Sequence, residues 1–185
     1  NSNFFNGQFL RKAYDLSDAD TAASYRQSSL PDSYESVSGV VSDAESALAA
    51  GNIVVAESLL RAALPAAPEN GELLHLLGLA VVGGGLADEA ISLLRRAVTS
   101  DRDQPIYRVA LGAVAAQNGR PLEAEREYQI ALSIDPMLVE AHFNLADLLT
   151  ETGRPDDAVR SYREALAVQP DLVEAHYNLG SVLDD

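Results

Sequence analysis

The chain has 185 residues and a formal net charge of −15, and its arginines outnumber lysine twelve to one. Such an acidic protein repels the phosphate backbone of nucleic acids and the surface of anionic membranes. Binding to nucleic acid and insertion into a membrane are therefore disfavoured. The absence of cysteine rules out disulfides and thiolate metal sites. Abundant alanine, few aromatic residues and no tryptophan favour closely packed helices over β-sheet.

The N-terminal 36 residues differ from the rest of the chain. They contain an apolar cluster next to the turn signal Asn6-Gly7, formed by Phe4, Phe5, Phe9 and Leu10. A short helix is predicted from Ser17, ahead of Pro31. We expect residues 1–16 to pack on the remaining chain or on a second copy. No apolar signal segment is visible, so a cytoplasmic location is expected, although the start at Asn1 indicates a processed or cut chain.

From residue 37 onward the sequence repeats every 34 residues. One column of the repeat holds glycine, two hold alanine and one holds leucine. The columns are Gly51, Gly85, Gly119 and Gly153; Ala56, Ala90, Ala124 and Ala158; Ala63, Ala97, Ala131 and Ala165; and Leu77, Leu111, Leu145 and Leu179. Several columns in one register indicate a repeat architecture rather than a bias towards alanine.

Each repeat predicts a helical hairpin. In the segment from Val139, apolar residues recur at helical spacing, which predicts an amphipathic helix, named helix A. Gly153 suits the positive φ that ends many helices, and Pro155 suits the first turn of the next helix, named helix B. Ala158 and Ala165 are small where helix B must approach helix A. Pro170 ends helix B. Such a hairpin stacks on its neighbours to bury both faces.

These residues resemble the tetratricopeptide repeat (TPR) family. Numbering from the first residue of each repeat, the family has Leu-Gly at positions 7 and 8, alanine at 20 and 27, a large residue at 24 and proline at 32. Leu77-Gly78 and Leu111-Gly112 match, whereas repeat 1 has Asp43-Ala44. The resemblance implies an all-α, right-handed superhelical solenoid of about four and a half repeats. The predicted repeats span 37–70, 71–104, 105–138, 139–172 and the partial 173–185.

No residue pattern argues for catalysis, a cofactor or a metal. His142 and His176 share position 4, but no third ligand keeps a matching spacing, so packing between helices is the favoured interpretation. Gly83-Gly84-Gly85 lacks the Lys-Ser/Thr of a phosphate loop and falls at the predicted turn of repeat 2. Acidic residues at the starts of B helices are interpreted as charges that favour the helix dipole.

The resemblance also implies a peptide-binding groove lined by A-helix positions 2, 5, 6, 9, 12 and 13. The candidate binding residues are His75, Leu76, Leu79, Val109, Ala113, Phe143, Asn144, Asp147, Tyr177, Asn178 and Ser181. Asn144 and Asn178 share position 6 and are similar to the asparagine ladder with which some TPR proteins hold a peptide backbone. The apolar part of this set is open to a second interpretation, ordinary packing between helices.

We therefore expect a non-catalytic scaffold or adaptor that binds another protein or peptide. Family members that grip acidic C-terminal tails use basic or amide residues at positions 5 and 9, where this chain has no lysine or arginine. A basic or amphipathic segment is thus the expected ligand. Two alternatives stay open. One is the accessory region of a larger enzyme, such as a glycosyltransferase, methyltransferase or sulfotransferase. The other is an assembly factor of the pilus-biogenesis kind.

The sequence ends inside helix A of repeat 5. Because no helix B follows, Val182 and Leu183 are expected to lack cover. We expect the natural protein to continue beyond Asp185, and the open end to associate with another copy.

Overall fold

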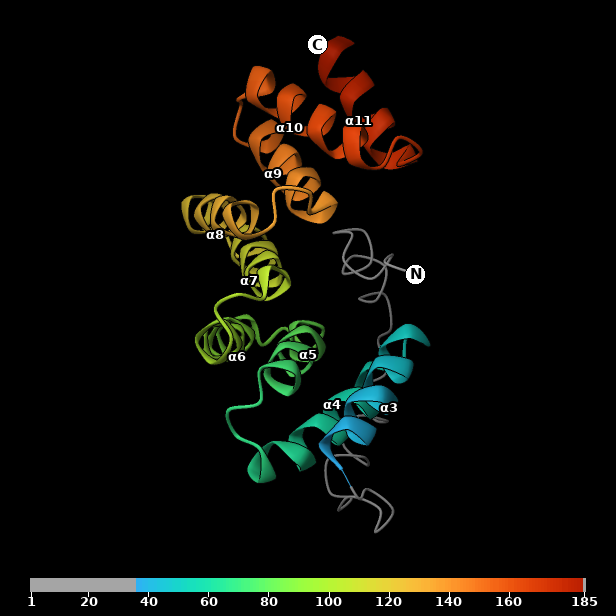
Figure 1. Ribbon diagram of the computed structural model, residues 1–185, viewed down its shortest axis with the longest axis vertical. Coiled ribbons are helices and arrows are strands. Elements are labelled where there is room, and N and C mark those ends of the chain that lie inside the picture. The colour runs from blue at the N-terminus through green and yellow to red at the C-terminus, as the bar shows by residue number, and fades with distance from the viewer. Residues whose placement is uncertain (1–35, 185) are drawn as a thin grey trace. The chain divides into compact units, whose positions relative to one another are not determined.

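The computed structural model describes residues 36–184, which contain α-helices and one short 3-10 helix but no strand. Predictions about residues 1–35 lie outside this range. Figure 1 labels the helices. They are α3 (Val37–Ala49), α4 (Ile53–Ala63), η1 (Leu64–Ala66), α5 (Gly71–Val82), α6 (Ala87–Ser100), α7 (Pro105–Gln117), α8 (Pro121–Ile134), α9 (Val139–Glu151), α10 (Pro155–Val168) and α11 (Val173–Asp184). The predicted all-α class is confirmed.

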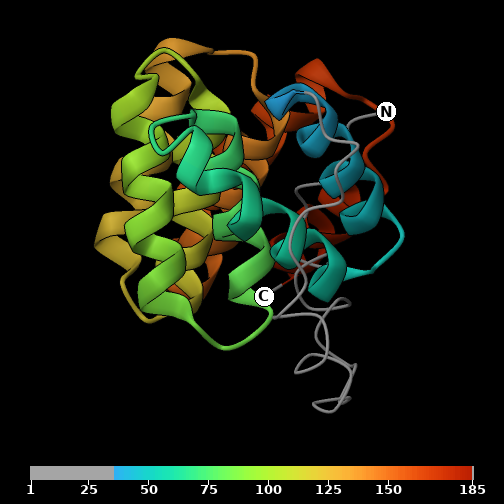
Figure 2. The same cartoon turned by 90° about the horizontal axis from the view of Figure 1, so that it is seen from below.

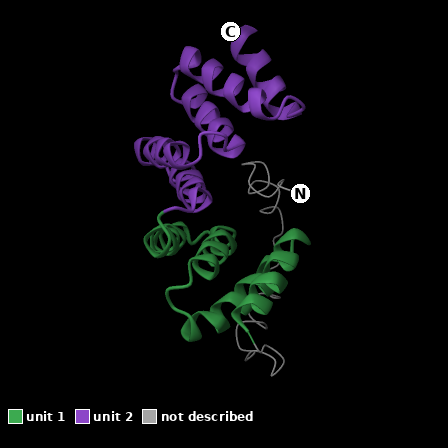
Figure 3. Ribbon diagram, in the orientation of Figure 1, with its two compact units in different colours: residues 1–102 green, residues 103–185 purple. Residues whose placement is uncertain are grey.

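The chain divides after Arg102 into two compact units (Figure 3). In unit 1 the hairpins are α3–α4 and α5–α6, and α5 also packs on α4 and α3. In unit 2 the hairpins are α7–α8 and α9–α10, and α11 packs on α10 and α9. Figures 1 and 2 show the two helices of a hairpin side by side. Thus α5 and α9 each contact their own helix B and the preceding hairpin of the same unit, and α11 contacts the hairpin before it.

Small residues bring the two helices of a hairpin together. The position 20 and 27 alanines of α6, α8 and α10 are all fully buried. Opposite them, a Cβ atom on Gly112 would stand 2.6 Å from Cε1 of Tyr128, and one on Gly78 would stand 2.7 Å from Cγ of Leu94. Only glycine therefore fits at these two places without a shift of the facing side chain. This close approach explains why the Leu-Gly pair recurs.

Glycine and proline set the helix boundaries as predicted. The turn glycines have φ between 69° and 76°, a region that side chains with a Cβ rarely adopt (Gly51, Gly85, Gly119 and Gly153). Proline occupies the first turn of α7, α8 and α10, where its missing N–H costs no helical hydrogen bond. The first helix of repeat 1 forms despite its departure from the Leu-Gly pattern, and Ser36 caps it by accepting a hydrogen bond from the Gly39 N–H at 3.3 Å.

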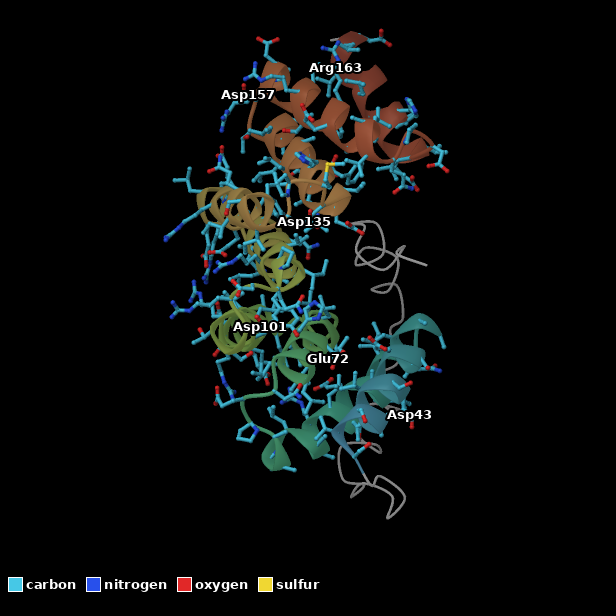
Figure 4. The ribbon with its side chains drawn as sticks, in the orientation of Figure 1. Asp43, Glu72, Asp101, Asp135, Asp157 and Arg163 are labelled. Atoms are coloured by element: carbon cyan, nitrogen blue, oxygen red, sulfur yellow. The ribbon has the colours of Figure 1, made fainter. Side chains whose placement is uncertain are left out.

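Arginines join neighbouring hairpins across their outer surface. In unit 1, Arg61 of α4 pairs with Glu89 of α6 at 2.7 Å. In unit 2, Arg154 pairs with Glu125 of α8 at 2.8 Å and with Asp157 at 2.8 Å. Asp157 is labelled in Figure 4. These pairs are solvent-accessible, so each adds little stability.

The last described helix differs from the expectation in one respect. Val182 packs against the core of unit 2, because its side of α11 faces α9 and α10. Leu183 lies on the other side, and its exposed fraction is 58%. Val173 and Tyr177 are also exposed, at 73% and 77%. A Cβ on Gly180 would meet nothing within 4 Å. The uncovered face of α11 is therefore the side of Gly180, not the side of Val182.

Gly112 and Gly180 occupy the same repeat position in different surroundings, and alanine substitutions should separate them. Gly112→Ala should lower the free energy of unfolding by about 1–3 kcal/mol, because the added methyl overlaps the Tyr128 ring. Gly180→Ala should raise it by about 0.5–1 kcal/mol, because alanine favours helix and has free space there. Urea denaturation measures both changes. Equal effects of the two substitutions would contradict close packing at Gly112.

Candidate peptide-binding face

The structure places the predicted binding residues in two units and at different depths. His75, Leu76 and Leu79 lie on α5 in unit 1, and the remaining residues lie on α7, α9 and α11 in unit 2. The buried members contribute to helix packing and offer little surface to a ligand: His75, Leu76, Val109, Phe143 and Asn144. The half-buried members are Leu79, Ala113, Asp147 and Asn178, and the exposed ones are Tyr177 and Ser181.

Burial of the apolar members has a clear cause in unit 2. Val109 and Phe143 belong to its hydrophobic core. The edge of the Phe143 ring meets Tyr162 of α10, with ring centroids 6.0 Å apart and planes at 65°. Positions expected to line a groove thus also belong to the core, and Phe143 packs helix A against its own helix B. For these residues the packing interpretation describes the structure.

A hydrogen-bonded junction in unit 2 links three helices. The Tyr162 hydroxyl of α10 donates to Oδ1 of Asp147 on α9 at 2.5 Å. The Asn178 amide of α11 donates to the same oxygen at 2.9 Å. Burial, together with the Asp147 carboxylate, raises the pKa of Tyr162 and keeps its proton in place as a donor. Asp147 therefore holds α10 and α11 against α9.

The two position 6 asparagines are not equivalent. The Asn178 amide is engaged with Asp147, whereas Nδ2 of Asn144 is buried and has no hydrogen-bond partner among the described residues. Sequence reasoning treated the pair as like rungs and missed Tyr162 as a polar group. The sequence did contain a signal for the junction: an acid at position 9 and a tyrosine at position 24 of one repeat, with an asparagine at position 6 of the next.

The exposed part of the unit 2 A helices is acidic. We call it the A-helix face and define it by the six groove positions of α7, α9 and α11. Its carboxylates are Glu140, Asp147, Glu151, Glu174 and Asp184, and these positions hold no lysine or arginine. The neighbouring Arg108 is occupied by Glu127 within the α7–α8 hairpin at 2.9 Å. The carboxylates of this face lie on α9 and α11, and its α7 positions are uncharged.

The histidines that share position 4 hold loops. Nε2 of His142 lies 2.9 Å from the carbonyl oxygen of Pro136, and Nε2 of His176 lies 2.8 Å from that of Pro170. Within residues 36–184 no group of three potential ligands gathers for a metal. The triple glycine forms the turn between α5 and α6, as predicted.

Comparison with known families agrees with this geometry. Three profiles described as TPR repeat or tetratricopeptide repeat match residues 47–113, 109–159 and 146–183. The chain belongs to the tetratricopeptide repeat family. No curated protein matches its sequence. None of the described TPR helices is long and apolar enough to cross a membrane.

Solved TPR structures share the fold. A thermophilic TPR protein of Thermus thermophilus superposes with a TM-score of 0.73 at 22% identity, covering 80% of this chain and 82% of that one. The MamA protein gives 0.67 at 21% identity, with 80% of each chain covered. The Thermobaculum terrenum O-GlcNAc transferase gives 0.67 at 29% identity over 70% of this chain, which corresponds to 25% of the transferase. A TPR domain bound to the HSP90 peptide SRMEEVD superposes with a TM-score of 0.60 at 17% identity. The match covers 62% of this chain and 91% of that one.

Removal of the junction acceptor should destabilise unit 2. Asp147→Ala leaves two donors without their acceptor, so the free energy of unfolding should fall by about 1–3 kcal/mol. Glu151→Ala, at an exposed position on the same helix, should change it by less than about 0.5 kcal/mol. Thermal and urea denaturation measure both. A full double-mutant cycle with Tyr162→Phe should show coupling, and simple additivity would contradict the junction.

The buried His75 of unit 1 should make the free energy of unfolding fall in acid. Burial lowers the pKa of His75 to about 4, whereas an unfolded histidine titrates near 6.5. Between these values the unfolded chain binds a proton that the folded chain does not, so stability falls as the pH drops from about 6.5 to about 4. The loss is on the order of 3 kcal/mol.

The control is His75→Leu, which removes the imidazole and retains every other ionisable group. The difference in unfolding free energy between the parent and this variant should depend on pH only in that window. A difference that stays constant from pH 7 to pH 4 would contradict the buried neutral imidazole.

Proposed function

We propose that the A-helix face of unit 2 binds a basic or amphipathic segment of another protein, and that the chain works as a non-catalytic scaffold or adaptor. The observation that carries this proposal is the Tyr177 side chain. It is 77% exposed on a face that carries carboxylates and no lysine or arginine. An exposed aromatic ring offers a large apolar contact surface to a partner, and this supports the proposal.

The charges support one class of ligand. Glu140 and Glu174 occupy position 2 of α9 and α11, and Asp147 of α9 accepts a hydrogen bond from Asn178 of α11. Lysine or arginine on a bound segment would gain favourable interactions there, and an apolar side chain would cover the Tyr177 ring. An acidic tail, such as the HSP90 peptide bound by the similar TPR domain, would meet like charge. The proposed ligand is therefore different in charge from that peptide.

A second candidate function is the accessory region of a larger enzyme. It is favoured by the likeness to the O-GlcNAc transferase, of which the matched part is one quarter of the chain. In this case the A-helix face would bind the protein substrate or a regulatory partner of the enzyme. The complete open reading frame separates the two: a catalytic domain in the same frame supports the second candidate.

Selection of displayed peptides tests the first proposal. The full chain is used to select from a library of unstructured peptides, and the affinities of the enriched peptides are measured by calorimetry. We expect enrichment of lysine or arginine next to a large apolar residue, and weaker binding at higher ionic strength. Enrichment of acidic peptides would overturn the charge assignment.

The matched pair Tyr177→Ala and Leu122→Ala locates the site. Both side chains are strongly exposed, but Leu122 lies at the start of α8, away from the A-helix positions. Tyr177→Ala should weaken peptide binding at least about tenfold, corresponding to a hot-spot loss above 1 kcal/mol. Leu122→Ala should leave affinity unchanged. Equal losses in the two variants would place the binding surface elsewhere.

A further inference from the structure

Residues 1–14, which we call the N-terminal segment, are opposite in charge to the rest of the chain. The segment contains Arg11 and Lys12 and no acidic residue, so its side chains carry two positive charges. Residues 15–185 hold all 28 acidic residues and 11 of the 13 basic ones, which gives them a net charge of −17. The N-terminal segment is therefore attracted to carboxylates of its own chain.

The N-terminal segment also carries large apolar side chains beside its positive charges. It contains three of the four phenylalanines of the chain, and Phe9 and Leu10 directly precede Arg11 and Lys12. The segment lies outside the range that the structure describes. Its sequence joins large apolar residues to basic ones, which is the ligand chemistry that the A-helix face favours.

The other pair of adjacent basic residues, Arg95-Arg96, is already part of unit 1. Arg96 lies on α6 and pairs with Glu69 at 3.6 Å. The apolar residues that precede the pair, Leu93 and Leu94, are buried. This pair therefore offers no apolar anchor to another surface, and the N-terminal segment is the candidate ligand within the chain.

The A-helix face of unit 2 complements the N-terminal segment in charge and in side-chain type. It carries five carboxylates, and the Tyr177 ring on it is 77% exposed. Aromatic rings pack favourably on each other, so a phenylalanine of the segment suits this ring. The same positions of α3 and α5 in unit 1 hold two carboxylates, Glu45 and Glu72, and no phenylalanine, tyrosine or tryptophan. Unit 2 is thus the better match.

The connection from the N-terminal segment to α3 is long enough to pass along unit 1. Its 23 residues, 13–35, can span at most about 80 Å. The helices of unit 1 have at most 14 residues. Four such helices packed side by side extend over about 40–50 Å. Attachment also gives the segment an effective concentration of up to about millimolar, which favours its own chain over a second copy in dilute solution.

We propose that the N-terminal segment occupies the A-helix face of unit 2 in the same molecule, with Phe9 against Tyr177 and Lys12 among the carboxylates. The segment then competes with the partner, so the chain controls access to its own binding face. A partner binds when it displaces the segment. This inference rests on the proposed function for the location of the binding face.

Cross-linking locates the segment, because Lys12 carries the only side-chain amine of the chain. A water-soluble carbodiimide joins this amine directly to a neighbouring carboxylate, and mass spectrometry of the full chain identifies the linked residues. Besides links to acidic residues close in sequence, such as Asp15, we expect links to carboxylates of the A-helix face. In a mixture of ¹⁴N- and ¹⁵N-labelled chains, these links should join residues of the same isotope.

The matched pair Tyr177→Ala and Leu122→Ala shows whether the contact depends on the exposed ring. In Tyr177→Ala the yield of links to the A-helix face, relative to links to Asp15, should fall about threefold or more. Leu122 is also strongly exposed, and Leu122→Ala should leave the yield unchanged. Equal yields in the two variants would overturn the inference. Links confined to sequence neighbours or to unit 1, or links between the two isotopes, would overturn it as well.

Release of the segment should strengthen peptide binding. In the double variant Arg11→Glu/Lys12→Glu, like charge keeps the segment off the face. A selected basic peptide should then bind at least about fivefold more tightly than to the parent chain, because the apparent dissociation constant varies inversely with the fraction of free faces. The control Arg126→Glu/Arg163→Glu makes the same change in net charge at exposed positions of α8 and α10. Equal affinities for the two double variants would contradict the competition.

The inference and the proposed function can fail separately. The peptide selection is repeated with the Arg11→Glu/Lys12→Glu chain, in which the face is open. If Lys12 links to the A-helix face and neither chain enriches a peptide, the inference stands and the proposed function fails. If peptides bind at Tyr177 and Lys12 does not link to that face, the proposed function stands and the inference fails.

Discussion

The close approach of helix A to helix B determines most of this structure. Gly112 has room for no Cβ against Tyr128, and Gly78 has none against Leu94. At that separation the alanines of helix B are fully buried, and the connecting turn is so short that its glycine takes a positive φ. A hairpin this thin cannot enclose a core of its own. It must place its remaining apolar surface on the next hairpin, which is the physical basis of stacking in repeat proteins.

Local rules made the fold predictable from the sequence. The helix boundaries depend on proline at helix starts and glycine at helix ends, and both effects act within a few residues of the chain. Each A helix begins at the residue from which its repeat was numbered, from Val37 to Val173. Even repeat 1 forms its helix, because Val40, Val41 and Ala44 supply a buried stripe in place of the Leu-Gly pair.

The candidate site was less predictable, because the burial of its residues depends on neighbouring helices rather than on the helix that carries them. His75, Val109 and Phe143 sit at groove positions by count, yet adjacent helices bury them. A repeat register places a residue on a helix face but does not say how much of that face a neighbour covers. The role of Asp147 was missed for the same reason: its two donors belong to α10 and to α11, in two consecutive repeats. No single repeat read in isolation contains that junction.

Divergence between repeats is therefore more informative about function than the shared pattern. Glycine and alanine columns are constant because each hairpin has the same packing problem. Positions 6, 9 and 24 differ along the chain, and each combination changes what the A-helix face offers. In unit 2, Asp147 at position 9 of α9 accepts hydrogen bonds from α10 and α11. Alanine stands at position 9 of α7, and the buried Nδ2 of Asn144 has no partner among the described residues. The backbone of the hairpins is the same in both cases. The side chain at position 9 decides whether a hydrogen-bonded junction joins one repeat to the next.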